Sequence, residues 1–191
     1  MVSRQSDAGV LWSMASVPVA QQVFRTVGGS RVAERVATAQ ERLYGPLLDW
    51  IRQSPFRTGA LGHSVHPPLT DVTIGCWLSA SVLDLLGGDE ARHGAQVLVG
   101  AGLVASVPTA MAGAADWATL AGSARRIGAV HALGTDAATF LLVGSLAARL
   151  RGRHGVGTGF AVAGNLVMAG AGLLGGHLAL SRGTARREVS R

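Results

Sequence analysis

Four long apolar stretches constrain this chain more than any other feature of its sequence. They lie near 70–87, 94–116, 127–149 and 157–180. A bilayer is crossed by about 20 helical residues at 1.5 Å each, so every stretch is long enough to span. Short, charged, glycine-bearing connectors separate them, as is typical of turns between antiparallel helices. We therefore predict an all-α fold, an integral membrane antiparallel four-helix bundle over residues 61–181.

Residues 1–60 differ from this bundle and are interpreted as an N-terminal arm. The apolar segment 8–19 is too short to span and contains a proline, so we expect an interfacial or loosely ordered arm. Between 31 and 51, apolar residues recur at helical spacing with arginine and glutamate between them. This pattern predicts an amphipathic helix on the membrane surface or against a partner, interrupted at Gly45-Pro46.

The charges indicate topology rather than nucleic-acid binding. All 17 basic residues are arginine, and they lie mostly beside the predicted spans, including the basic tail 182–191. Arginine is enriched on the cytoplasmic side of membrane proteins. The side that holds both termini and the second connector has eight arginines near spans against four on the other. We therefore expect both termini in the cytoplasm, the lipid bilayer as a partner and no nucleic acid.

The single cysteine, Cys76, limits the chemistry of any bound metal. One cysteine excludes an internal disulfide, a four-cysteine zinc site and a cysteine-ligated iron–sulfur cluster within one chain. The sequence also has no phosphate-binding glycine loop, nucleophile elbow or zincin motif. Whether the chain is an enzyme is left open, and an electron-transfer or accessory subunit is favoured over a stand-alone enzyme.

Ionisable side chains gather at one predicted depth. His131 lies about four residues into the third span, and His177 about three residues before the end of the fourth. Because the third span leaves one membrane surface and the fourth returns to it, both lie within about one helical turn of that surface. Ionisable groups inside spans are candidates for a functional site. The other members of this layer are His63, His66, Asp71 and Asp116.

Each of these residues has a structural alternative. Asp71 follows two prolines and a threonine and could cap the first helix. Asp116 stands beside Trp117 and could lie at headgroup level next to an aromatic anchor. His131 and His177 lie in apolar runs, where a hydrogen-bonded core histidine competes with a ligand or proton carrier.

The first functional hypothesis for the layer is a b-type haem. Such an iron takes two axial imidazoles, and His131 and His177 match in depth on sequential antiparallel helices. Nearby glycines could leave room for a flat macrocycle, although in membranes they more often serve close helix packing. Arg125 and Arg126, near the same surface, could pair with the propionates.

Two further hypotheses use the same residues. A non-haem metal or proton site would hold iron, zinc or copper through the histidines His63, His66, His131 and His177, with Asp71 or Asp116 as a ligand or orienting group. A structural cluster would instead pin the helices together and recruit a soluble partner, without any cofactor.

Four motifs, taken in order, resemble a known family. LGHSVHPPLTDVTIGCW at 61–77, ADW at 115–117, VHALGT at 130–135 and GGHLAL at 175–180 are similar to the bacterial membrane family called domain of unknown function 2231. Together they cover residues 61–180. The positions that match the family pattern are His63, His66, Asp71, Trp77, Asp116, Trp117, His131 and His177.

The resemblance implies a four-span protein of the bacterial inner membrane. Some relatives are fused to a Rieske-type iron–sulfur domain, which favours electron transfer and hence haem. No such domain follows here, so a Rieske-type or other redox partner would be a separate chain, and a homo-oligomer is left open. Ser64 and Thr73 replace prolines of the family pattern, and Gly134 stands near a usual asparagine, which puts local backbone geometry in doubt.

Overall fold

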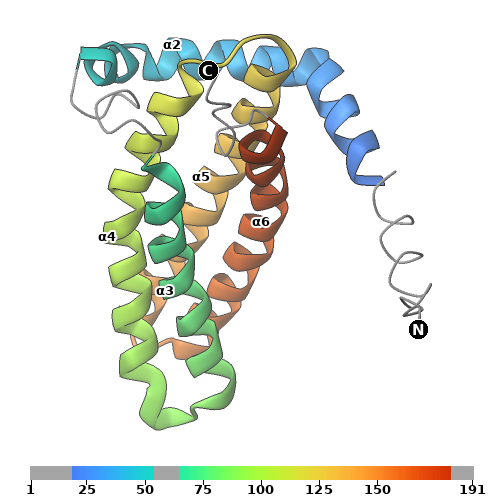
Figure 1. Ribbon diagram of the computed structural model, residues 1–191. Coiled ribbons are helices and arrows are strands. Elements are labelled where there is room, and N and C mark those ends of the chain that lie inside the picture. Colours follow the sequence, from blue (N-terminus) through green and yellow to red (C-terminus); the bar gives the residue numbers. More distant parts are fainter. Residues whose placement is uncertain (1–18, 54–64, 182–191) are drawn as a thin grey trace, which may run out of the picture.

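The computed structural model describes residues 19–53 and 65–181, and every regular element in these ranges is helical (Figure 1). Four long helices run antiparallel as a bundle, and each is long and apolar enough to cross a membrane. This confirms the predicted fold class. The bundle helices are α3 (His66–Leu86), α4 (Arg92–Trp117), α5 (Gly122–Leu150) and α6 (His154–Ser181), with a 3₁₀ turn, η1 (Asp89–Ala91), before α4.

The first bundle helix begins four residues before the predicted span. Two prolines occupy its first turn, where a backbone N–H has no helical partner and the fixed proline φ suits the helix. His66 is therefore the first residue of α3, and Val65 caps the helix without a side-chain hydrogen bond. Asp71 lies in the second turn, so the interpretation of Asp71 as the helix cap was wrong.

The predicted amphipathic helix is α2 (Arg31–Gln53), which lies across one end of the bundle (Figure 1). Its buried face includes Leu48 and Ile51. The expected interruption at Gly45-Pro46 was wrong, because the helix continues through Pro46. Pro46 lies on the exposed side, and Arg42, whose carbonyl loses its N–H partner there, is also exposed, so water can satisfy that carbonyl.

A further helix, 19–29, precedes α2 and was not predicted. Its valines at 19, 23 and 27 recur every four residues, a pattern that could have indicated it. Only Gly28 of this helix is fully buried, and a side chain there would meet Ser123 at 3.1 Å. Apart from its last residue, the predicted arm at 8–19 lies outside the described residues, as do His63 and the tail 182–191.

The two hairpins of the bundle repeat one pattern of residues. The sequence His66-Pro-Pro-Leu-Thr-Asp at the start of α3 recurs in α5 as His131-Ala-Leu-Gly-Thr-Asp. Eleven residues after each histidine, a large side chain lies against a glycine of the following helix. Trp77 approaches Gly102, and Leu142 approaches Gly164, so closely that a Cβ on either glycine would lie under 2.5 Å from it. The α3–α4 and α5–α6 hairpins are thus two versions of one unit.

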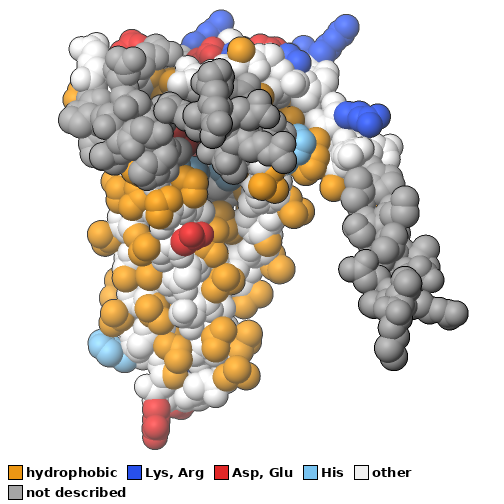
Figure 2. Space-filling model, in the orientation of Figure 1, with side chains coloured by type: hydrophobic (Ala, Val, Ile, Leu, Met, Phe, Trp, Pro, Cys, Tyr) orange, Lys and Arg blue, Asp and Glu red, His pale blue; other side chains and the backbone are white. Residues whose placement is uncertain are grey.

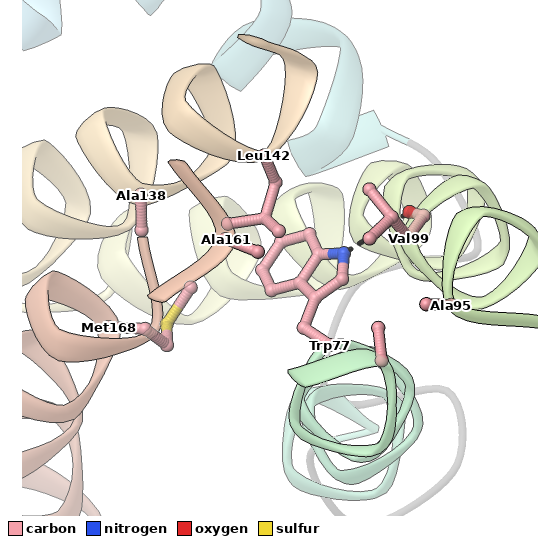
Figure 3. Close-up of a cluster of buried hydrophobic side chains, with 8 residues drawn as sticks. Trp77, Ala95, Val99, Ala138, Leu142, Ala161 and Met168 are labelled. Atoms are coloured by element: carbon pink, nitrogen blue, oxygen red, sulfur yellow. Dashed lines mark hydrogen bonds between the residues drawn. The ribbon is translucent and has the colours of Figure 1, made fainter. Parts of the chain in front are cut away.

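Equivalent residues of the two hairpins meet along the middle of the bundle. The rings of His66 and His131 contact each other. Trp77 and Leu142 share the buried core (Figure 3), and the Asp84 carboxylate binds the Arg149 guanidinium. A residue that meets its own counterpart lies near a twofold axis. An approximate twofold axis therefore runs along the bundle, with the histidine pair and the ion pair 18 residues, or about 27 Å, apart.

Candidate functional site

The centre of the candidate site is a pair of imidazoles. The rings of His66 and His131 meet edge to face, with centroids 6.5 Å apart and planes at 85°. One ring comes from each hairpin, from the first residue of α3 and the first half of α5. Figure 1 shows that α3 and α5 begin at the end of the bundle covered by α2. The structure therefore brings together two of the four histidines that the sequence placed at one depth.

Both imidazoles are anchored in the same way. The Nδ1 atom of His66 lies 3.0 Å from the carbonyl oxygen of Thr109, and that of His131 lies 2.8 Å from the carbonyl oxygen of Ala171. A carbonyl oxygen can only accept, so each Nδ1 carries a proton and donates it. In the neutral ring, the lone pair is then on Nε2.

Each imidazole ring packs against the backbone of a glycine. Gly113 and Gly175 follow the two accepting carbonyls by four residues, one helical turn. A Cβ at Gly113 would come within 2.9 Å of Cε1 of His66, and one at Gly175 within 2.7 Å of Cε1 of His131. The glycines are thus required for the close approach of the rings.

The room expected for a flat macrocycle is taken at several glycines by protein atoms. His131 fills the space at Gly175, Trp117 lies against Gly128, and Ala171 would meet a Cβ on Gly134 at 2.9 Å. These glycines serve close packing. Gly170, Gly172 and Gly176 have open space beside them because they are exposed on the outer face of α6.

A buried threonine pair supports the first anchor. The hydroxyls of Thr73 and Thr109 lie 2.9 Å apart, and both threonines are buried. Thr73, which replaces a proline of the resembled family pattern, also donates to the carbonyl of Leu69. This contact fixes α4 against α3 at the turn whose carbonyl holds His66.

His177 does not join the pair in the described residues. It lies two residues beyond Gly175, about 200° around α6 from the face that meets His131. Its ring stacks on Phe24 of helix 19–29, with centroids 3.7 Å apart and planes at 12°. The same ring lines an open pocket of about 620 Å³ together with Arg25 and Ser123.

Arg125 and Arg126, expected beside haem propionates, hold α2 instead. Arg125 binds both carboxylate oxygens of Glu41, at 2.6 and 2.7 Å, and donates to Glu34 at 2.7 Å. Arg126 donates to Glu34 and to the carbonyl of Gly28. The hydrogen bonds from the two guanidiniums hold the pKa of Glu34 below its usual value.

The two predicted carboxylates differ in exposure. Asp71 is exposed on α3, and Asp116 is half-buried at the end of α4, beside Trp117. The indole Nε1 of Trp117 donates to the carbonyl of Arg125 at 3.0 Å. Across residues 19–53 and 65–181, no three His, Cys, Asp or Glu side chains gather as a metal site.

Two polar contacts were missed by sequence reasoning. The hydroxyl of Tyr44 donates to Oδ2 of Asp136 at 3.0 Å. The Asn165 amide donates to the carbonyl of Trp77 and to Ser81. Burial, and then the charge of Asp136, raise the pKa of Tyr44. The repeated His-x₃-Thr-Asp sequence was the signal that could have marked Asp136.

The second missed contact is a buried ion pair at the other end of the axis. Arg149 donates two hydrogen bonds to the carboxylate of Asp84 and one to the hydroxyl of Ser145. The side chains of Arg149 and Asp84 are 0% and 3% exposed. Arg149 had been counted among the flanking arginines that set topology, but it lies inside the bundle.

In comparisons with known proteins, no family model, curated protein or solved structure matches the chain.

Proposed function

We propose that this multi-pass membrane protein holds a redox-active transition metal, as haem b or as a single ion, between His66 and His131. The observation that carries the proposal is the shared anchoring of the two Nδ1 atoms by backbone carbonyls. Metal-binding histidines almost always donate their other N–H in this way. If both Nε2 atoms turned toward one metal at about 2.0 Å each, the ring centres would lie about 6 Å apart, and the centroids of the edge-to-face pair lie at 6.5 Å.

The number of ligands bears on the choice between haem and a single ion. Two imidazoles complete the axial positions of a haem iron, whereas a non-haem ion takes about four ligands. The histidines that would hold a haem iron are therefore proposed to be His66 and His131, in place of His131 and His177. His63 and Asp116 are the proposed further ligands of a single ion. The metal would supply a one-electron centre, and the chain holds each imidazole in one tautomer and one orientation.

The wider setting is proposed from the resemblance to domain of unknown function 2231. It is a bacterial inner-membrane protein with both termini cytoplasmic, exchanging electrons with a separate Rieske-type or other redox protein. The arginines support this orientation. At the α2 end, Arg31, Arg35 and Arg42 are exposed. At the other end Arg151 and Arg153 are exposed, while Arg92 binds Asp89 and Arg149 binds Asp84. Reporter fusions that place the C-terminus outside would contradict it.

The test is the absorption spectrum and metal content of the full chain purified from haem-replete cells. Haem predicts a Soret band that shifts on reduction, and a single ion predicts about one metal per chain without that band. His66→Ala and His131→Ala should each abolish the signal. His177→Ala and the exposed His93→Ala are the matched controls and should retain it.

Two results would overturn the proposal. One is a colourless, metal-free protein, and the other is a cofactor retained in both His66→Ala and His131→Ala. A cofactor-free protein that loses thermal stability on the same two substitutions would instead establish the structural role for the histidine pair.

A further inference from the structure

A pocket of about 620 Å³ lies between helix 19–29 and the ends of α5 and α6. Arg25 lines it from helix 19–29, Ser123 from the first turn of α5, and His177 from near the end of α6. Pockets that bind small molecules have volumes of about 300–1,000 Å³, so this one is large enough for a ligand. The proposed metal between the imidazoles uses none of these three side chains.

The short helix that precedes α2 is fixed against the bundle at two places around this pocket. Arg126 donates to the carbonyl of Gly28, and Gly28 packs on Ser123, where a Cβ on the glycine would lie 3.1 Å from the serine Cβ. One turn earlier, the ring of Phe24 stacks on His177 with the two planes at 12°. Contacts within the chain thus fix the walls of the pocket.

The side chains that line the pocket are suited to an anion. Among the described lining residues none is a carboxylate, and Arg25 brings a positive charge. In the described part of the chain, no hydrogen bond or ion pair uses the Arg25 guanidinium, the Ser123 hydroxyl or the His177 ring nitrogens. By contrast, Arg125 nearby is engaged by two glutamates. Guanidinium and hydroxyl donors bind phosphate oxygens through charge-assisted hydrogen bonds.

The depth of the pocket favours a phospholipid as the source of that anion. Ser123 is the second residue of α5 and His177 lies four residues before the end of α6, and both helices can span a membrane. The ends of spanning helices lie in the headgroup layer. The far side of helix 19–29 carries Val19 and Val23, which are 64% and 46% exposed, as in an interfacial helix that turns its apolar face to lipid. On the face drawn in Figure 2, basic side chains gather at the α2 end, above a bundle surface covered by apolar side chains.

We propose that this pocket binds the headgroup phosphate of an anionic phospholipid. Arg25 and the Ser123 hydroxyl donate to the phosphate oxygens, and His177, held by its stack on Phe24, supplies a third donor. A zwitterionic headgroup binds less well, because its ammonium group brings a second positive charge close to Arg25. The bound lipid joins helix 19–29 to the bundle at the membrane face.

The test is native mass spectrometry of the full chain, released from an uncharged detergent after incubation with phosphatidylglycerol. The unsubstituted chain should retain this lipid, and Arg25→Gln should lower the retained fraction by about tenfold, because it removes a charged hydrogen-bond donor. Arg35→Gln is the matched control, since it removes an equal charge from an exposed site on α2 outside the pocket, and it should retain the lipid. Equal retention by the two variants would overturn the proposal.

Two further arms identify the ligand. Phosphatidylcholine should be retained about tenfold less than phosphatidylglycerol, and inorganic phosphate should not displace the bound lipid. A chain that retains no phosphatidylglycerol, or retains both lipids equally, would contradict the proposal. Displacement by inorganic phosphate would overturn it in favour of a free phosphate ion.

One variant separates this inference from the proposed function. His177→Ala should lower the retention of phosphatidylglycerol while it keeps the cofactor held by the histidine pair. Lipid retention that is unchanged in both His177→Ala and Ser123→Ala would contradict the assignment of this pocket. Circular dichroism of each variant in detergent checks that it remains folded.

Discussion

The two ends of the approximate twofold axis solve the same problem differently. At one end, Asp84 and Arg149 occupy equivalent positions of the two hairpins and carry opposite charges, so they satisfy each other in a fully buried pair. At the other end, the equivalent positions are both histidine, and each ring donates its Nδ1 proton to a backbone carbonyl. The equivalent residues thus differ at one end and are identical at the other.

The two ends differ in whether the paired side chains satisfy each other's hydrogen bonds. A carboxylate and a guanidinium complete each other's hydrogen bonds, and Ser145 accepts from the remaining guanidinium nitrogen. Two neutral imidazoles with their Nδ1 protons already donated can offer each other only lone pairs at Nε2. A proton or a metal can link such atoms, but neither ring supplies it to the other. The ion pair is thus complete in itself, whereas the proposed function places a metal at the histidine end.

The largest expected effect is at the ion-pair end. Arg149→Met should lower the free energy of unfolding by about 3–5 kcal/mol, because it leaves the Asp84 carboxylate buried without its partner. The measurement is thermal or denaturant unfolding of the full chain in detergent micelles, followed by circular dichroism.

Two controls sharpen this result. The double variant Asp84→Leu, Arg149→Met should recover most of the loss, because apolar replacement of a whole buried pair is often neutral or better. Arg151→Met, at an exposed arginine two residues further along the chain, should change little. If the double variant is as unstable as Arg149→Met, then loss of the charge pairing does not explain the instability. The contrast between the two ends would then weaken.

The next effect tests how the histidine end is built. Gly175→Ala should destabilise the protein by about 1–3 kcal/mol, because its Cβ would lie 2.7 Å from Cε1 of His131 and would displace the ring. Gly172→Ala, one turn earlier with open space beside it, should be neutral or gain up to about 1 kcal/mol from helix propensity. Unfolding midpoints of the two variants measure the difference. Equal effects would show that the ring has room to move and is not held in place.

The third prediction concerns the contact between α2 and the second hairpin. Tyr44→Phe should cost about 1–2 kcal/mol, through loss of the hydrogen bond to Asp136. Because the folded pKa of Tyr44 is raised, this tyrosine contributes stability below its unfolded pKa of about 10, and the contribution is lost as the pH rises through the folded pKa.

The chain has one tyrosine and four tryptophans, and only the tyrosine ionises at high pH, so the pH-dependent change of its ultraviolet absorbance reports Tyr44. The titration midpoint should lie above that of the unfolded chain, and Asp136→Asn should lower it. A midpoint that is equal in the folded and unfolded chains would remove Tyr44 as the group that covers Asp136.

Much of the fold could be predicted from the lengths and spacing of the apolar stretches. The four spans and α2 follow from hydropathy and helical periodicity, which are local properties of the sequence. The start of α3 and the continuity of α2 at Pro46 were missed for one physical reason. A proline lacks an N–H and blocks one carbonyl, and its effect depends on whether the position needs that N–H and whether water reaches the carbonyl.

The sequence could predict the depth of the site residues in the membrane, but not which way their side chains face. Histidines at one level follow from counting along spans, but which two meet depends on the rotation of each helix. The distribution of apolar residues around each bundle helix is a weak guide to which face turns inward, because lipid and core are both apolar. His177 turns to Phe24, and His131 turns to His66. The internal repeat of His-x₃-Thr-Asp carried this information, since equivalent residues of the two hairpins meet on a shared axis.

The smallest expected effect is acid loosening of the α2 end. The folded pKa of Glu34 is lowered by Arg125 and Arg126, so its contribution to stability is present above the ordinary glutamate pKa of about 4.3 and is lost as the pH falls through the folded pKa. Glu34→Gln should therefore unfold at a slightly lower temperature than the unsubstituted chain near neutral pH, and the gap should close in acid. Asp89→Asn, in an exposed ion pair at the other end, should show almost no gap at any pH. A Glu34→Gln gap that persists in acid would mean that the carboxylate acts by shape and not by charge, and the α2 end would then be held as permanently as the end closed by Asp84 and Arg149.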